Sequence, residues 1–214
     1  MRTIFIPAKI KSEVNKPKIL SLSKKLPKTL AIAYSIQYKE IAEEIKKILS
    51  KSHKITKFIQ VLGCSKPNFT KETKAVLLIG SGKFHAVSLA FETKLPIYIL
   101  ENNKLEKIST KDIEGLEKSQ KASYVKFLNA KQVGIMVSTK PGQQNLKKAI
   151  DFKKKQTSPN QVGPKEGVKQ TYLFITNNID AREFENFGLD SWVNTACTRM
   201  DMNDSRIINL YKLR

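Results

Sequence analysis

Cysteine is scarce in this sequence, and the cysteines it has are far apart. Cys64 and Cys197 are the only two among 214 residues. A small secreted domain stapled by disulfides needs more than one pair, so we expect a protein of the reducing cytoplasm. A structural zinc site usually shows Cys-x-x-Cys spacing, which is missing here.

Long apolar runs are also missing. No stretch approaches the ~20 apolar residues that a membrane-spanning helix needs. The N-terminus, Met1 to Pro7, has too short an apolar core for a secretory signal peptide and lacks a small-residue cleavage site. Because 40% of the residues are nevertheless apolar, we expect a folded globular protein that does not associate with membranes.

Arginine is rare although the chain is strongly basic. Only five of the 39 basic residues are arginines, and the formal net charge is +20. Proteins that read nucleic acids prefer arginine for bidentate contacts and interleave aromatic residues for base stacking. Neither pattern is present, so we interpret the charge as a solvated lysine surface and do not expect direct nucleic-acid binding. Electrostatic steering toward an acidic or RNA-bound partner stays open.

Short apolar segments alternate with amphipathic ones along the whole chain, which is typical of βαβ units and parallel sheets. We therefore predict an α/β fold of two small three-layer domains, residues 1–120 and 121–214, with mainly parallel sheets. Residues 10–28 are expected to be a connector, and residues 157–169 a mobile loop. Strands are predicted at 30–36, 58–64, 75–79, 96–100, 133–137, 172–175 and 192–197. Helices are predicted at 41–49, 84–92, 111–132 and 180–187, and a further basic helix after residue 142 is predicted to end near Gln156.

Each cysteine follows a segment that we predict to be a buried parallel strand. Open α/β sheets place ligand-binding groups at the carboxyl ends of such strands. Cys64 and Cys197 are therefore either two parts of one site or small apolar core residues, which free cysteines often are. An iron–sulfur cluster can take single thiolates from distant elements. For such a cluster this chain has too few cysteines of its own.

Two strand-to-helix loops carry polar groups suited to a small ligand. The glycines of Gly80-Ser81-Gly82-Lys83 allow a close backbone approach, and the amides of a helix N-terminus attract anions. The glycine spacing is neither that of a Walker A loop nor that of a dinucleotide fingerprint. We expect a carboxylate or another small polar ligand there, or else an ordinary tight turn. His85, just beyond, is interpreted as structural.

The second loop, Ser138 to Gln144, offers hydroxyl, amide and ammonium groups from Ser138, Lys140 and Gln143 beside Gly142. Arg199 follows Cys197 closely enough for its guanidinium to hold a carboxylate near the thiol. The alternative is that Arg199 pairs with nearby aspartates, Asp201 and Asp204, in a surface network.

Five motifs occur in one order along the chain, and together they resemble a known family. The resemblance is to the archaeal diphthamide-synthesis enzymes, 2-(3-amino-3-carboxypropyl)histidine synthase, and it extends over almost the whole sequence. No single motif is specific enough alone. The motifs are Ala33–Tyr38, Gln60–Cys64, Leu78–His85, Gly134–Gln143 and Val193–Arg199.

The resemblance implies three similar α/β domains that each donate one cysteine to a 4Fe-4S cluster. In that family the open iron engages S-adenosylmethionine, and a 3-amino-3-carboxypropyl radical attacks a histidine of elongation factor 2. Cys64 and Cys197 correspond to the cysteines of the second and third domains. The residues expected to bind S-adenosylmethionine are Gln37, Gly80, Ser81, Gly82, Lys83, Ser138, Lys140, Gly142, Gln143 and Arg199.

The resemblance begins at the second domain of the family pattern, so we expect that the first domain and its cysteine are not part of this chain. The resemblance therefore implies that another polypeptide, or a second copy in a homodimer, supplies the third cluster ligand. The alternative is a non-catalytic accessory or degenerate subunit that binds the partner enzyme or elongation factor 2.

Overall fold

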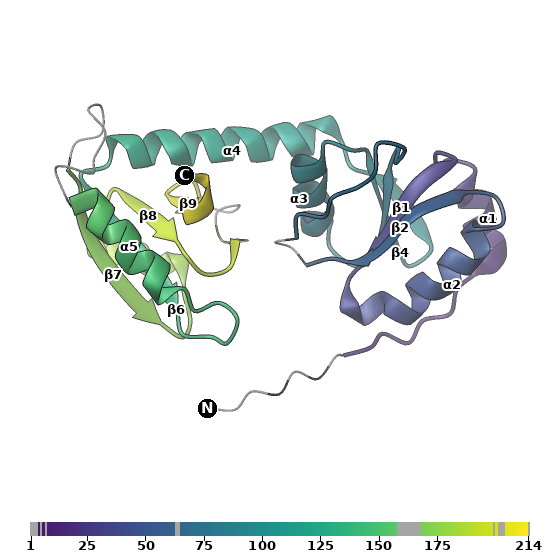
Figure 1. Ribbon diagram of the computed structural model, residues 1–214, viewed down its shortest axis with the longest axis horizontal. Helices are drawn as coiled ribbons and strands as arrows, with labels where there is room; N and C mark the ends of the chain where they lie inside the picture. Colours follow the sequence, from purple (N-terminus) through teal and green to yellow (C-terminus); the bar gives the residue numbers. More distant parts are fainter. Residues whose placement is uncertain are drawn as a thin grey trace. The chain divides into compact units, whose positions relative to one another are not determined.

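A computed structural model describes residues 4, 6, 8–62, 65–157, 168–198, 200 and 204–213 of the protein. The chain divides into two compact units, Met1–Gly115 and Leu116–Arg214. The division falls within one long helix, α4 (Thr110–Asn129), which Figure 1 shows as a single rod. The expected boundary after residue 120 falls in the same helix.

The sheet of the first unit has five strands in the order β2-β1-β3-β4-β5, parallel except for the last pair. The continuous apolar runs form the central strands because both of their faces are covered. The strands are β1 (Thr29–Tyr34), β2 (Lys54–Gln60), β3 (Val76–Ile79), β4 (Ile97–Glu101) and β5 (Lys104–Lys107).

Helices cover both faces of this sheet. Paired residues Ile32 and Leu77 point toward α1 (Lys16–Ser23) and α2 (Lys39–Leu49), with which they share one apolar core. Their neighbours along the strands point to the opposite face because side chains alternate. There α3 (Lys83–Thr93) packs beside β4, and Figure 1 shows α3 across the sheet from α2.

Two expectations for this unit are wrong, and one strand was not predicted. The expected connector at 10–28 contains helix α1, which is capped by Asn15 and buries Ile19 against the core. The antiparallel strand β5 was not expected, since it is mostly exposed and lacks an apolar pattern. The strand predicted at 58–64 ends at Gln60, and it is only partly buried because β2 lies at the sheet edge.

The sheet of the second unit is fully parallel, in the order β7-β6-β8-β9. The strands predicted around 133–137 and 172–175 are confirmed, whereas the strand predicted at 192–197 ends at Asn194. The last strand was not expected, because only three residues form it. The strands are β6 (Gln132–Ser138), β7 (Gln170–Thr176), β8 (Ser191–Asn194) and β9 (Ile207–Asn209).

One face of the second sheet is covered by the end of α4 and by α5 (Leu146–Thr157), and the other by a 3-10 segment, η2 (Ala181–Phe187). Trp192 is buried under η2, stacked on Phe184 at 4.2 Å between ring centroids. A Cβ at Gly134 would lie 2.3 Å from the Trp192 ring. The sheet can hold this indole only because position 134 has no side chain.

Both sheets use the same order for their four parallel strands: second, first, third, fourth. In each sheet the second strand lies on one side of the first strand and the third strand lies on the other side. A topological switch point therefore lies between the first and third strands. Ligands of open α/β sheets bind at the carboxyl ends of the strands at this point. The described part of the chain contains no helix long and apolar enough to cross a bilayer.

Candidate functional site

Cys197 lies just past the switch point of the second unit. The hydroxyl and the amide of Thr195 both donate to the carbonyl of Met136, at 2.7 and 3.2 Å, and the chain then leaves the sheet. Cys197 is reached on the next turn, as a free and half-buried cysteine. The structure thus confirms that a cysteine follows a strand end, and it places Cys197 outside the apolar core.

Two buried asparagine side chains form hydrogen bonds with the backbone of this turn. Asn194, only 3% exposed, accepts from the amide of Ala196 and donates to the carbonyl of Cys197 at 2.7 Å. It also donates to Oδ1 of Asn209 at 2.6 Å. Asn209, 1% exposed, donates in turn to the carbonyl of Thr198 at 2.8 Å. The two carbonyls at Cys197 and Thr198 are therefore both held by buried amides.

A third asparagine ties the neighbouring loop to the same turn. Nδ2 of Asn145 donates to the carbonyl of Thr195 at 2.8 Å and to that of Gln143 at 3.3 Å. None of the three asparagines was predicted from the sequence. The available signal was two asparagines, Asn194 and Asn209, that end apolar strands, where a polar residue must find partners.

The predicted loop Ser138 to Gln143 forms a tight turn at the carboxyl end of β6. The amide of Gln143 donates to the carbonyl of Lys140 at 3.0 Å, and Gly142 has φ +78°. Pro followed by Gly in this geometry is typical of a type II turn. The ammonium of Lys140 donates to Oδ1 of Asn178 at 2.7 Å, and the hydroxyl of Ser138 accepts from the Lys140 amide.

The predicted glycine loop lies at the switch point of the first unit. A Cβ at Gly80 would lie 3.2 Å from the hydroxyl of Ser35, so the two strand ends approach closely there. Gly82 has φ +87° and precedes the first turn of α3. Gln37 lies in η1 (Ile36–Tyr38) after β1, and its carbonyl accepts from the amide of Ile10. Ser81, between the two glycines, is exposed.

Lys83 is paired with two carboxylates. Its ammonium lies 2.9 Å from Asp112 and 3.4 Å from Glu106. The hydrogen bond to Asp112 raises the pKa of Lys83. The pKa of Asp112 is lowered by hydrogen bonds from Ser109 and Lys83. An anion at this loop would therefore meet backbone amides rather than an uncompensated ammonium charge.

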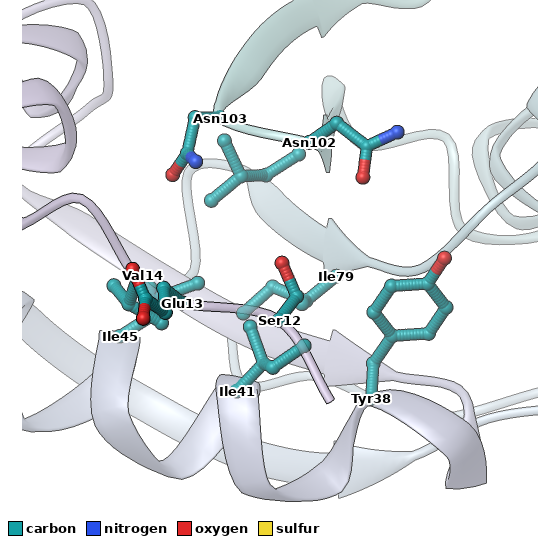
Figure 2. A pocket seen from close by; sticks show the side chains of 10 residues that line it. Ser12, Glu13, Val14, Tyr38, Ile41, Ile45, Ile79, Asn102 and Asn103 are labelled. Atoms are coloured by element: carbon teal, nitrogen blue, oxygen red, sulfur yellow. The ribbon is translucent and has the colours of Figure 1, made fainter. Parts of the chain in front are cut away.

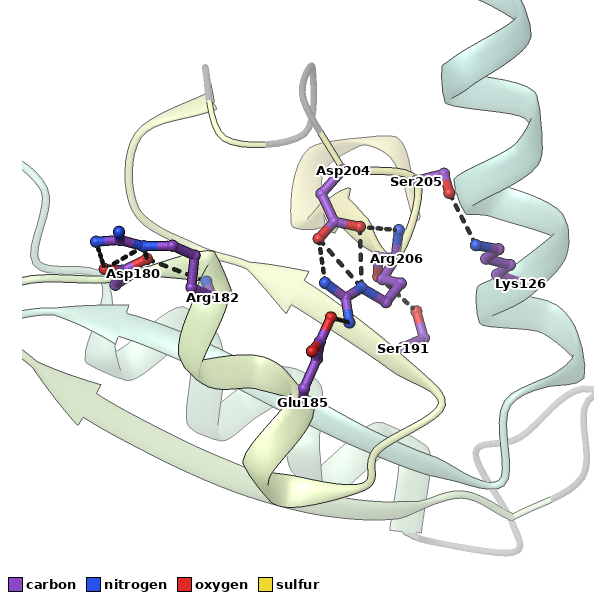
Figure 3. A network of polar contacts seen from close by, with 8 residues as sticks. All are labelled: Lys126, Asp180, Arg182, Glu185, Ser191, Asp204, Ser205 and Arg206. Atoms are coloured by element: carbon purple, nitrogen blue, oxygen red, sulfur yellow. Dashed lines mark hydrogen bonds and ion pairs between the residues drawn. The ribbon is translucent and has the colours of Figure 1, made fainter.

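A polar network around Arg206 lies where β8 and β9 begin (Figure 3). The guanidinium of Arg206 binds Asp204 at 2.8 Å and lies 3.5 Å from Glu185. Burial by itself raises the pKa of Asp204, but the hydrogen bonds from Arg206 outweigh it and leave that pKa lowered. In the network considered from the sequence, Asp204 was a partner for Arg199. The structure pairs it with Arg206, while Arg199, Asp201 and Cys64 lie outside the described residues.

Two cavities differ greatly in size. The one in Figure 2 lies beside Tyr38 and Ile79 in the first unit and has a volume of about 20 Å³, which is room for one water. The other, of about 310 Å³, lies under η2 in the second unit and is lined by Phe174, Phe187 and Trp192. This aromatic cavity was not predicted from the sequence.

No cluster of three or more metal-binding side chains is found among the residues that the structure describes. The sequence matches the family model described as "Putative diphthamide synthesis protein" over residues 1–209. It is 28% identical to the 2-(3-amino-3-carboxypropyl)histidine synthase of Pyrococcus horikoshii, covering 94% of this chain and 60% of that protein. To the synthase of the same name from Methanocaldococcus jannaschii it is 27% identical, covering 95% of this chain and 57% of that protein.

Among solved structures, the fold is similar to that of Dph2 from Pyrococcus horikoshii with a 4Fe-4S cluster. The TM-score is 0.73 at 22% identity, covering 95% of this chain and 64% of that one. A second structure of that protein gives a TM-score of 0.72, covering 89% of this chain and 57% of that one. The chain therefore spans about 60% of the length of the relatives it matches.

Proposed function

Since the chain belongs to the family of diphthamide synthesis proteins, we propose that it is a component of a 3-amino-3-carboxypropyl transferase. The group would pass from S-adenosylmethionine to a histidine of elongation factor 2, the first step of diphthamide formation. The observation that carries this proposal is the free, half-buried Cys197 on a turn at a sheet's switch point. The chain's relatives are named as synthases, and one solved relative contains a 4Fe-4S cluster.

Cys197 fits the chemistry of cluster ligation. Iron–sulfur clusters are held by cysteine thiolates, and this sulfur is unpaired and outside the core. Cys64 is assigned as the second ligand from the family resemblance. Because these 214 residues contain two cysteines, a third protein ligand would come from outside them, and a separate polypeptide or a second copy of this chain are the sources we propose to test.

The predicted loops have roles consistent with binding S-adenosylmethionine. The amides at the N-terminus of α3, behind Gly82 and Lys83, suit the carboxylate of that ligand. Gln37, Lys140 and Gln143 supply amide and ammonium donors at the two switch points. The cluster, when bound, supplies the electron for reductive cleavage, and the protein's own residues hold and orient the ligand.

The two units correspond, in this proposal, to the second and third domains of the longer family members. Their shared strand order supports descent from one domain type. The domain ranges expected from the sequence, 1–120 and 121–214, follow the same assignment.

Anaerobic reconstitution with iron and sulfide tests the ligand role. The chain, alone and mixed with a candidate first-domain polypeptide, should develop charge-transfer absorbance that is lost in Cys64→Ala and Cys197→Ala. Ser65→Ala and Thr198→Ala, each next to a cysteine, are matched controls that should keep it. Absorbance that is absent from both mixtures, or that survives both cysteine changes, contradicts the proposal.

A second candidate function is an accessory subunit that binds the partner enzyme or elongation factor 2 without catalysis. The pairing of Lys83 with two carboxylates favours it, because that charge is already neutralised. This candidate expects Cys64→Ala and Cys197→Ala variants to restore diphthamide in cells lacking the protein. Loss of complementation in both variants excludes it.

A further inference from the structure

We propose that Asn194, Asn209 and Asn145 are positioning residues that hold the thiol of Cys197 at the edge of the second sheet. The inference rests on the proposed role of Cys197 as a cluster ligand, and it adds residues to which no role is assigned. We call these three side chains the amide clamp. They come from distant parts of the chain and meet on one turn.

The side chain of Asn194 makes three hydrogen bonds at this turn. Its oxygen accepts from the amide of Ala196 at 2.9 Å, while its nitrogen donates to the carbonyl of Cys197 and to Asn209. The carbonyl of Cys197 also accepts from the amide of Met200 at 3.2 Å. The backbone on the carbonyl side of Cys197 is therefore fixed on two sides.

Burial makes the clamp selective for asparagine. At 3% and 1% exposure, Asn194 and Asn209 cannot exchange these bonds for water. A buried amide that loses a partner carries the full cost of its desolvation. Aspartate has the same shape but cannot donate, so it would face carbonyl oxygens with a carboxylate oxygen.

Asn145 extends the clamp to the loop after β6. By donating to the carbonyls of Thr195 and Gln143, it joins the Cys197 turn to the loop that carries Lys140. The two loops flank the switch point between β6 and β8. Partners that orient a ligating side chain typically change metal affinity when they are removed.

The test uses the whole chain with Cys64→Ser, so that Cys197 is the only thiol. Asn209→Asp removes the bond to Thr198 but keeps the acceptor for Asn194, and Asn145→Asp removes the bond to Thr195. Asn194→Asp removes two donated bonds and is the most severe change. Aspartate serves as well as asparagine at the start of a helix, so Asn145→Asp leaves the beginning of α5 intact.

The first readout is the rate at which iodoacetamide alkylates Cys197, measured by mass spectrometry. Asn209→Asp should raise this rate about fivefold and Asn194→Asp about tenfold or more, because lost buried hydrogen bonds favour local opening. The matched control is Val133→Ala, which removes core volume from β6 far along the strand from Cys197. It should lower the melting temperature as much as Asn209→Asp but leave the alkylation rate unchanged.

The second readout is iron binding in Asn209→Asp and Asn145→Asp chains that retain both cysteines. After anaerobic reconstitution with ferrous iron and sulfide, the affinity for iron should fall about tenfold in Asn209→Asp, as for other partners of metal ligands. Alkylation rates that follow melting temperature alone, with Val133→Ala as fast as Asn209→Asp, overturn the inference. If the unsubstituted chain shows no Cys197-dependent iron binding either alone or mixed with the candidate first-domain polypeptide, the proposed function fails, while the alkylation rates still decide the clamp.

Discussion

The two units share a strand order but differ in the residues that come after their third strand. In the first unit β3 is followed by Gly80-Ser81-Gly82, a bare backbone turn into α3. In the second, β8 is followed by Thr195, Ala196 and Cys197, held by the amide clamp. The same position in one topology therefore presents backbone amides in one unit and a thiol in the other.

The cysteines also occupy different places in the shared order. Cys197 follows the third strand of its sheet, whereas Cys64 follows β2, the second strand of its own. In the second unit, the residues after the second strand are Asn177 and Asn178. A simple duplication of one cysteine-bearing domain does not account for this arrangement.

The largest expected effect is a loss of stability in the second unit, where Gly134 packs directly against the ring of Trp192. Gly134→Ala should lower the free energy of unfolding of the second unit by about 3 kcal/mol, because the new Cβ collides with the indole of Trp192. Trp192 is the only tryptophan, so its fluorescence during urea unfolding reports on this unit alone. Gly115→Ala, in an open part of α4, is the control and should stabilise by up to ~1 kcal/mol. Equal stability of Gly134→Ala and the parent would contradict the packing.

The next prediction concerns the residue before the second strand of the second unit. Lys169, 3% exposed, donates to the carbonyls of Leu128 and Ala130 at 2.9 Å and so caps the end of α4. Lys169→Met leaves those carbonyls without this partner, and it should cost about 2 kcal/mol. Urea unfolding monitored by Trp192 fluorescence measures the loss. The exposed Lys154→Met is the control, and a cost shared by both variants would refute the cap.

The equivalent position of the first unit gives a smaller effect. His53 precedes β2 and is also buried, but its Nε2 has no hydrogen-bond partner, and Nδ1 lies 2.9 Å from the Ser52 hydroxyl. His53→Leu should change the free energy of unfolding by less than about 1 kcal/mol, because an unsatisfied polar atom is removed with one hydrogen bond. Circular dichroism during urea unfolding measures it. A loss of unfolding free energy as large as that of Lys169→Met would contradict the expected difference between His53 and Lys169.

The smallest effect is electrostatic and concerns an ion pair of the second unit. Hydrogen bonds from the side chain and the amide of Arg182 lower the pKa of Asp180 to about 2. Because the pKa is lowered on folding, this pairing contributes to stability above the ordinary carboxyl pKa, and the contribution is lost as pH falls toward 2. Carboxyl NMR should give a midpoint near pH 2, returning toward 3.8 in Arg182→Ala. An unchanged midpoint in that variant would refute the pairing.

Much of the fold could be predicted because burial leaves a local signature. The runs that became β1, β3 and β6 are apolar throughout, and the spacing of Ile41, Ile45 and Ile48 predicted α2. Elements without that signature were missed. Helix α1 begins in a lysine- and proline-bearing segment, and β5 is exposed on its edge.

The loops of the candidate site were predicted from the sequence, but the side chains that hydrogen-bond to those loops were not. The glycine loop, the Ser138–Gln143 turn and Cys197 all follow strands, and that much is visible in the chain order. The amide clamp was not, because Asn145, Asn194 and Asn209 meet only through the packing of α5, β8 and β9. The pairing of Lys83 with Asp112 was missed for the same reason.

The sequence by itself determined the alternation of strands and helices, the positions of the loops and the number of thiols, since each depends on residue type and local period. Only the tertiary structure decided the order of the strands, and with it which loops meet at a switch point. Strand order depends on how crossover connections pack against a whole sheet, and no short stretch of residues carries that information.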